Sequence, residues 1–451
     1  MTPAGPTGPE AARQVAWAWV DHLRAGGTTP WRDFRSGHRT DLVPDQAPDQ
    51  APDRADVSRG RLPGAAQLEL ARLLAERAAN QTYPDPDARG ALIDRALERS
   101  GPGRGLLELP LDLAGDLTGD LAGDLTGKPT DRVGAPATDP ADVPAEELVR
   151  VGVGLLVVEL LRAGAQAGSN RNRRRRRRPF SGSFLLGGAP TTTAAVRAAL
   201  ADAGHLGGGR SPEVLLLAPP LEQMLGQVWS ARVQRGAPVS WTDFVGRWSR
   251  QVALPPSADL SALARSWAER VGAGRVHVVA DPDPLRTAAD LLGIRLRAAG
   301  RASTPDLVPL PGAAVDLLRR VNQVLAVRVP EDQQAAFRRV VSASWASGSR
   351  GMPADADEPG IVVPSRHRHW VEEQSARLVK ELRRGGYPVH GDLDRITARQ
   401  LGPQRPRRRE VLDLVLDVVL EVAAATDMTG QSEQSTQRTQ RTQRTSGGRH
   451  R

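Results

Sequence analysis

Apolar residues recur at intervals of three and four through much of the first 163 residues, and this spacing predicts amphipathic helices. Helices are expected over residues 11–23, 65–79, 88–99 and 144–163. Gly26 and Gly27 end the first helix, and residues 28–31 are expected to form a turn. The N-terminal part of the chain is therefore predicted to be all-α.

After Pro179 the pattern changes to short apolar runs that alternate with helical stretches, which is typical of α/β folds. Strands are expected at residues 184–186, 214–217 and 276–279. Helices are expected over residues 193–203, 221–235, 241–251, 260–271, 311–325, 331–344 and 367–384. A turn and a short extended piece are expected to follow the last helix, over residues 385–392.

Four segments show neither pattern. Residues 41–60 repeat Pro-Asp-Gln-Ala and are predicted to be a disordered insertion. Residues 112–127 repeat Asp-Leu-(Ala/Thr)-Gly four times, which indicates a low-complexity linker and leaves open an aspartate array that binds calcium. Residues 164–179 are expected to be an exposed arginine-rich linker, and residues 427–451, with Thr-Gln-Arg three times, a disordered tail.

A separate helix is expected over residues 409–426. Its residues are mostly apolar, but Asp413, Asp417 and Glu421 recur every four residues and form one acidic stripe. Like charges at this spacing repel slightly, so the helix needs support from the rest of the chain or from a second copy.

These boundaries predict seven segments. They are an N-terminal helix and turn (1–40), a disordered insertion (41–60), a helical domain (61–163), an arginine-rich linker (164–179), an α/β domain (180–400), a C-terminal helix (409–426) and a disordered tail (427–451).

The composition excludes several kinds of chemistry. The chain has no cysteine, which rules out disulfides, thiolate nucleophiles and cysteine-based zinc sites. No apolar run approaches the roughly 20 residues of a membrane span, and the N-terminus lacks the charged-then-apolar pattern of a secretion signal. A cytoplasmic protein without membrane contact is expected.

Positive charge is concentrated in three short segments, residues 171–178, 405–409 and 438–451, which hold seven, four and five arginines. Because the formal net charge of the whole chain is +9, the remainder is mildly acidic. The run Arg173–Arg178 could contact polyanions non-specifically, although no aromatic residues are interleaved with it.

Three blocks in order resemble the bacterial sulfotransferase family, P-loop enzymes that use 3′-phosphoadenosine 5′-phosphosulfate as donor. They are residues 214–229 continuing to Phe244, residues 275–282 continuing to Ile294, and residues 317–322 with Trp370 through Asp394. With the loop before them, the resemblance spans about residues 180–396. It implies a reduced P-loop-type parallel sheet with flanking helices, preceded by the all-α domain.

The same resemblance points to a donor-binding loop. Residues 187–193, Gly-Gly-Ala-Pro-Thr-Thr-Thr, are similar to the family's Gly-x-Pro-Lys-(Ser/Thr)-Gly-Thr-Thr loop, in which backbone N–H groups hold phosphate. The candidate cofactor-binding residues are Gly188, Thr191, Thr192 and Thr193. Thr191 stands where the family has its lysine, and a neutral hydroxyl cannot replace that charge. Alternatively, Thr191 or Thr192 is simply the N-cap of a helix.

Further family residues are missing. Pro219 and Pro220 stand where the family has an arginine that grips the 3′-phosphate and an aspartate, and Gln227 stands at a serine position. His205 is the only histidine between the loop and the next strand, and we assign no catalytic residue. His367 and His369 are interpreted as exposed residues at a helix start, so no metal site is expected.

We therefore expect a sulfotransferase-like protein that has lost donor binding and catalysis, needs no cofactor, and acts as a binding or scaffold protein for an unknown protein partner. Two alternatives stay open. One is a divergent active sulfotransferase that transfers sulfate from 3′-phosphoadenosine 5′-phosphosulfate to a hydroxyl acceptor, with linker arginines replacing the missing cations. The other is a polyanion-binding protein that uses Arg173–Arg178.

Overall fold

The computed structural model describes residues 9–41, 62–81, 86–98, 109–113, 137–166, 184–296, 306–346, 361–400 and 402–446. The chain divides into two compact units. A helical unit comprises Met1–Gly168 together with Leu412–Arg451, and an α/β unit comprises Ser169–Val411. Along the sequence, the α/β unit is thus inserted into the helical unit. Within the described residues, no helix is both long and apolar enough to cross a membrane.

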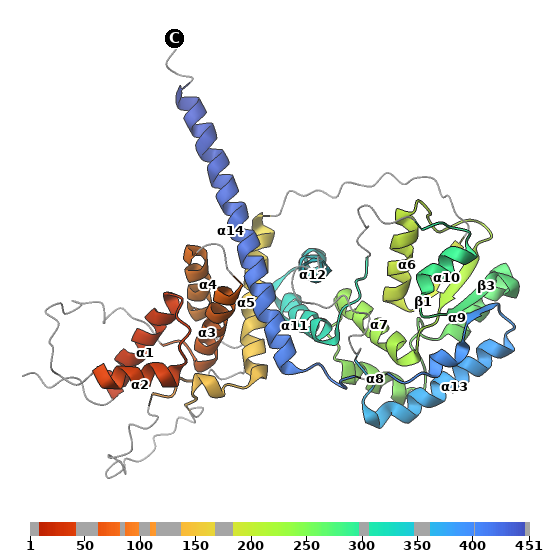
Figure 1. Cartoon of the computed structure of the whole chain (residues 1–451), viewed down its shortest axis with the longest axis horizontal. Coiled ribbons are helices and arrows are strands. Elements are labelled where there is room, and N and C mark those ends of the chain that lie inside the picture. The colour runs from red at the N-terminus through yellow and green to blue at the C-terminus, as the bar shows by residue number, and fades with distance from the viewer. Residues whose placement is uncertain are drawn as a thin grey trace, which may run out of the picture. The chain divides into compact units, whose positions relative to one another are not determined.

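The helical unit contains all four helices expected from the N-terminal pattern (Figure 1). Its described elements are α1 (Pro9–Arg24), α2 (Trp31–Asp41), α3 (Ala65–Asn80), α4 (Pro86–Glu98), the 3₁₀ helix η2 (Pro140–Asp142), α5 (Ala145–Gln166) and α14 (Arg408–Ser446).

Helix α2 begins where the sequence predicted only a turn. The residues after Trp31 are mostly polar, so the apolar periodicity that identified the other helices is weak here. Tertiary packing supplies what the pattern lacks: the Trp31 side chain is buried, and its ring lies 5.2 Å from that of Trp19 between centroids. Burial of two large aromatic rings stabilises a short polar helix that its sequence alone would not.

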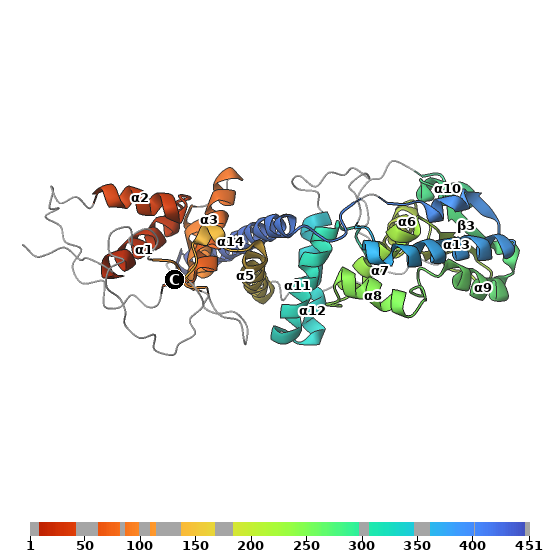
Figure 2. The same ribbon diagram turned by 90° about the horizontal axis from the view of Figure 1, so that it is seen from below.

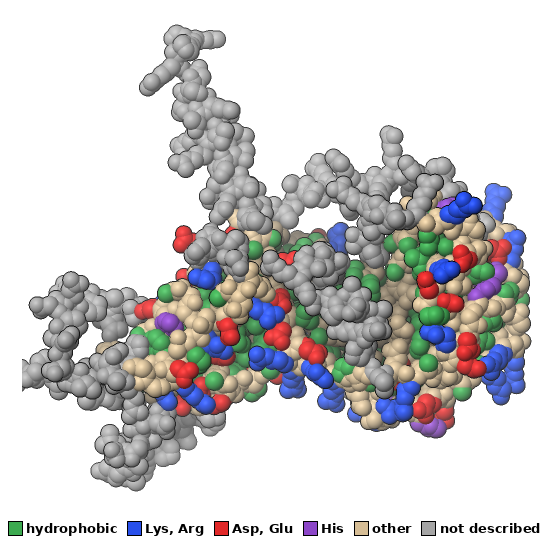
Figure 3. Space-filling view, in the orientation of Figure 1, with side chains coloured by type: hydrophobic (Ala, Val, Ile, Leu, Met, Phe, Trp, Pro, Cys, Tyr) green, Lys and Arg blue, Asp and Glu red, His purple; other side chains and the backbone are tan. Residues whose placement is uncertain are grey.

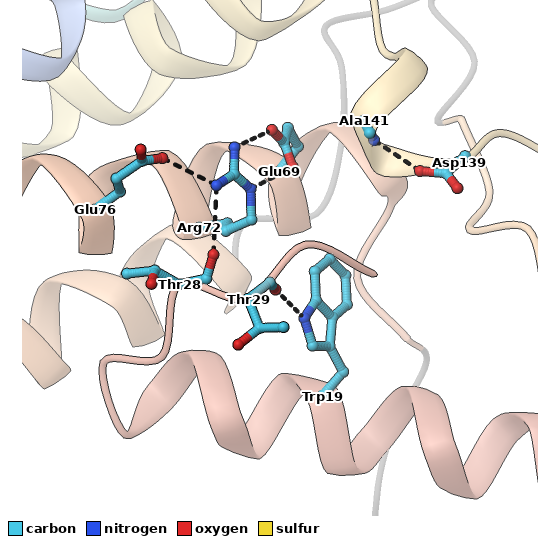
Figure 4. Close-up of polar contacts among 8 residues, drawn as sticks. All are labelled: Trp19, Thr28, Thr29, Glu69, Arg72, Glu76, Asp139 and Ala141. Carbon is cyan, nitrogen blue, oxygen red and sulfur yellow. Dashed lines mark hydrogen bonds and ion pairs between the residues drawn. The ribbon is translucent and has the colours of Figure 1, made fainter. Parts of the chain in front are cut away.

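Side chains from α1 and α3 hold the turn between α1 and α2 (Figure 4). The indole Nε1 of Trp19 donates to the carbonyl of Thr29 at 2.9 Å, and Nη1 of Arg72 donates to the carbonyl of Thr28 at 3.4 Å. The Arg72 guanidinium is also paired with Glu69 at 2.7 Å and with Glu76 at 2.9 Å. The turn carbonyls are therefore satisfied by protein donors, as partly buried backbone requires.

Helix α14 packs within the helical unit and accounts for the predicted acidic stripe. Asp417 accepts hydrogen bonds from Nε and Nη2 of Arg77 in α3, at 2.8 and 2.7 Å, and from the amide of Gln81 at 2.6 Å. The chain's own N-terminal helices thus provide the support that the repelling carboxylates need. The predicted end at residue 426 was wrong, because α14 continues to Ser446. No proline occurs in the Thr-Gln-Arg repeats to stop the helix.

The α/β unit contains a four-stranded sheet with strand order β1-β2-β3-β4, in which all neighbouring pairs are parallel. The strands are β1 (Phe184–Gly188), β2 (Glu213–Leu217), β3 (Val276–Ala280) and β4 (Val389–Gly391). The three predicted strands are confirmed, and the short extended piece near the C-terminus is β4. The observed class is therefore α/β.

Helices connect the strands, and some of them pack directly on the sheet (Figure 2). They are α6 (Pro190–Asp202), α7 (Leu221–Gln234), α8 (Trp241–Arg250), α9 (Leu260–Val271), α10 (Pro284–Leu291), α11 (Gly312–Arg328), α12 (Glu331–Ala346) and α13 (Arg368–Arg384), with the 3₁₀ helices η3 (Ala273–Arg275), η4 (Ser365–His367) and η5 (Leu393–Thr397).

The core of the α/β unit lies on both faces of the sheet. On one face, Leu215, Leu217 and Val279 pack with residues of α6 and α10 such as Leu200 and Ala288. The alternate strand residues on the other face, Val214, Leu216, Val276 and Val278, are fully buried as well. Burial on both faces explains why the strands are continuous apolar runs, as is usual for parallel sheets.

Candidate functional site at the carboxyl edge of the sheet

The chain turns sharply at the carboxyl end of β1, where the sequence predicted a donor-binding loop. Gly188, the last residue of β1, has φ of +95°, in the region that favours glycine. A Cβ atom at this position would lie 2.4 Å from the carbonyl oxygen of Leu217 in β2. Pro190 is the first residue of α6, so the turn leads directly from strand to helix. A strand, a tight turn and a helix therefore follow one another directly at this point.

The three threonines are not equivalent. Thr191 and Thr193 are buried, and the Thr193 hydroxyl donates to the carbonyl of Gly187 at 3.2 Å. Thr192 is half-buried. Its backbone N–H donates to Oε1 of Gln227 at 3.1 Å, and its hydroxyl is within 2.8 Å of the amide nitrogen of Gln227.

The N-cap interpretation of these threonines is wrong. Ala189 is the N-cap of α6 and has no side chain able to cap the helix. Instead, the acceptor for an N-terminal N–H of α6 comes from Gln227, which is on α7 and 35 residues away in sequence. Thr192 is already inside the first helical turn, and its side chain bonds to this same amide.

The contact between Thr192 and Gln227 changes what the loop can bind. In a phosphate-binding loop, an anion oxygen accepts hydrogen bonds from N–H groups at the helix N-terminus. Here the neutral amide oxygen of Gln227 takes the Thr192 N–H. The resemblance placed Gln227 at a separate position of the donor site, and the structure brings the two positions together. A phosphate would have to displace Gln227 and would gain no cation from Thr191.

The carboxyl end of β2 leads into a second part of the same edge. Pro220 precedes α7 and supplies no side-chain cap. Glu222, in the first turn of α7, is 6% exposed, and its carboxylate accepts a hydrogen bond from the backbone N–H of Gln400 at 2.9 Å. The helix dipole stabilises a carboxylate at the helix N-terminus, but this carboxylate would repel a phosphate at the same place.

The cavity beside the α7 N-terminus is small. It measures about 40 Å³ and is lined by Glu222, Arg368, Glu372, Ser375 and Arg399 among others. The Nε group of Arg368 is buried and has no hydrogen-bond partner among the residues that the structure describes. Ligand pockets for nucleotides and drug-sized molecules are usually about 300–1,000 Å³, so this cavity can hold only one or two water molecules.

The histidines noted in the sequence have separate partners. Nδ1 of His367 lies 2.9 Å from the Ser249 hydroxyl, and burial lowers the pKa of His367. His369 pairs instead with Glu373 at 3.0 Å, and the backbone N–H of His205 donates to Leu200. Across the described parts of the chain, no group of three or more His, Asp or Glu side chains is arranged to hold a metal ion.

A hydrogen-bonded chain across three strands could not be predicted from the sequence. Glu213 on β2 lies 3.1 Å from Nε2 of His277 on β3, and Nδ1 of His277 lies 3.0 Å from Nε2 of His390 on β4. Burial and the neighbouring His277 lower the pKa of His390. The three residues are far apart in sequence and meet only through the parallel strand register, so no local motif marks them.

On the face in view, the described surface carries acidic and basic side chains interspersed rather than a patch of one sign (Figure 3). The run Arg173–Arg178 lies outside the described residues, and so does the repeat at 112–127 except for its first two residues. Comparison with protein-family models, with curated proteins and with solved structures finds no match.

Proposed function

We propose that the α/β unit is a sulfotransferase-like module that no longer binds 3′-phosphoadenosine 5′-phosphosulfate and serves as a binding or scaffold module for another protein. The observation that carries the proposal is the contact between Gln227 and Thr192. It occupies the N–H group and the hydroxyl that a donor phosphate would need.

Three other features support the same conclusion. Thr191 is buried and uncharged where the family has a lysine. Pro219 and Pro220 supply neither a cation nor a backbone N–H before α7. Glu222 adds a buried negative charge at the helix terminus that would receive the 3′-phosphate. Each change weakens anion binding, and together they act at both phosphate positions of the donor.

Isothermal titration of the full chain with 3′-phosphoadenosine 5′-phosphate tests the proposal. We expect no saturable binding at micromolar ligand, because phosphate could bind the loop only after the hydrogen bonds between Gln227 and Thr192 had been broken. A Gln227→Ala variant frees the Thr192 N–H, so it is the variant that should gain weak binding of 3′-phosphoadenosine 5′-phosphate. Gln234→Ala, also on α7, is the matched control, since Gln234 bonds to Val308 and not to the loop. Saturable micromolar binding to the unchanged protein would overturn the proposal.

The divergent active enzyme makes the opposite prediction. It requires Thr192 to release Gln227 when the donor arrives, so radiolabelled sulfate should be transferred to hydroxylated acceptors and the transfer should be lost in a Thr192→Val variant. The proposal expects no transfer by either protein.

A further inference from the structure

A second cavity lies in the α/β unit, apart from the loop at β1. It measures about 130 Å³ and lies between the segment after α8, the start of α9, and α13. Its apolar walls are Val252, Ala253, Leu254 and Leu378. The volume equals that of about four water molecules, which is enough for a small amino acid.

The polar wall contains a largely buried amide side chain. Gln374 on α13 is 7% exposed, lines the cavity, and forms no hydrogen bond with any residue that the structure describes. Its carboxamide can both donate and accept, so it is suited to a ligand that offers groups of both kinds.

Charged groups of both signs surround this amide. Ser261 donates to Glu381 at 2.5 Å and lies 2.9 Å from Oδ1 of Asp259. Nε of Arg377 donates to the other oxygen of Glu381 at 2.8 Å. These bonds use neither the two Nη groups of Arg377 nor the second oxygen of Asp259.

The charges balance, because a further arginine, Arg265, lies 3.9 Å from Glu381 and makes two cations against two carboxylates. A ligand with a net charge gains little from such a wall. A zwitterion gains at both ends, since its carboxylate can meet the Nη groups of Arg377 and its ammonium group the free oxygen of Asp259.

We propose that this cavity binds a small zwitterion of the amino-acid class with an apolar side chain. The carboxylate lies on Arg377 and the amide of Gln374, the ammonium group lies on Asp259, and the side chain contacts Leu254 and Leu378. The site is independent of the loop at β1 and of the proposed function.

Titration of the full chain with L-alanine, L-valine and L-leucine tests the proposal, together with analogues that lack one charge. Isobutylamine keeps only the ammonium group, and isovalerate keeps only the carboxylate. We expect saturable binding of at least one amino acid below about 10 mM, and at least about tenfold weaker binding of both analogues.

Two variants remove the recognition groups with little change in volume. Gln374→Met and Arg377→Met should each weaken amino-acid binding by at least about tenfold. Lys380→Met, on an exposed position of the same helix outside the cavity wall, should leave it unchanged. Thermal melts of all three check that α13 stays folded. Absence of binding by all three amino acids, equal binding of an analogue, or unchanged binding by a folded Gln374→Met variant would overturn the proposal.

Discussion

Gly152 is a position in the helical unit where an added side chain would meet close packing. It lies in α5 and is buried against α14. A Cβ atom on Gly152 would lie 2.6 Å from Cγ1 of Val415 and 3.5 Å from Cδ1 of Leu70. The second distance is ordinary contact, but the first requires movement. The perturbation of choice is therefore Gly152→Ala, which adds one methyl group at the contact between α5 and α14.

Two opposing effects set its magnitude. Alanine in a helix interior is about 1 kcal/mol more favourable than glycine. Overpacking a buried contact costs about 1–3 kcal/mol, and Val415 cannot simply rotate away because valine in a helix has one strongly preferred rotamer. Gly90 in α4 provides the matched control, since its nearest neighbour would be 3.7 Å from an added Cβ. Gly90→Ala should stabilise the helical unit by about 1 kcal/mol. The free energies of unfolding of the two variants should therefore differ by about 1–3 kcal/mol.

Hydrogen exchange measured on peptides of α5 and α14 is the suitable assay, because a chain of two units need not unfold in a single transition. Gly152→Ala should lower protection in both helices, and Gly90→Ala should not. A second substitution, Val415→Ala, removes the clashing methyl group and should couple favourably with Gly152→Ala. If the amides of α5 and α14 are as well protected in Gly152→Ala as in Gly90→Ala, and if Gly152→Ala shows no coupling to Val415→Ala, the close packing of α14 on α5 is refuted.

Three further substitutions or conditions test other parts of the fold. Glu159 is fully buried and pairs with Arg95 and Arg162, so Glu159→Gln should lower the free energy of unfolding by about 3 kcal/mol. An unchanged midpoint of chemical denaturation would contradict these buried ion pairs. Gly188→Ala should cost about 2 kcal/mol or more, because of its positive φ and the clash with Leu217, and an unchanged thermal melt would contradict this. The lowered pKa of His390 means that the unfolded chain binds more protons below pH 6.5, so stability should fall as pH drops below that value, and less so in His390→Asn.

The parallel strands could be predicted because their burial on both faces leaves a simple signal. Val214 to Leu217 is a continuous apolar run, as expected for a central strand of a covered sheet. β4 gave a weaker signal, since it has three residues and two of them are exposed. Helix α2 gave almost none, because its stability depends on the contact between Trp31 and Trp19 rather than on its own periodicity.

The candidate site was predictable as a segment but not as an arrangement. The sequence showed a strand, glycines and threonines in the order of a phosphate-binding loop. It could not show that Gln227 bonds to Thr192, because that contact depends on how α7 packs against α6. The predicted N-cap failed for a related reason: a side chain distant in sequence satisfies the helix terminus. No local spacing rule relates two residues that are 35 positions apart in the chain.

The position of α14 in the chain has a consequence for how the protein reaches its fold. The α/β unit is inserted between α5 and α14, yet Arg77 in α3 pairs with Asp417 in α14 across 340 residues. Contacts of such high sequence separation form late, because the loop between them must close first. The helical unit is therefore completed only after the α/β unit has been made.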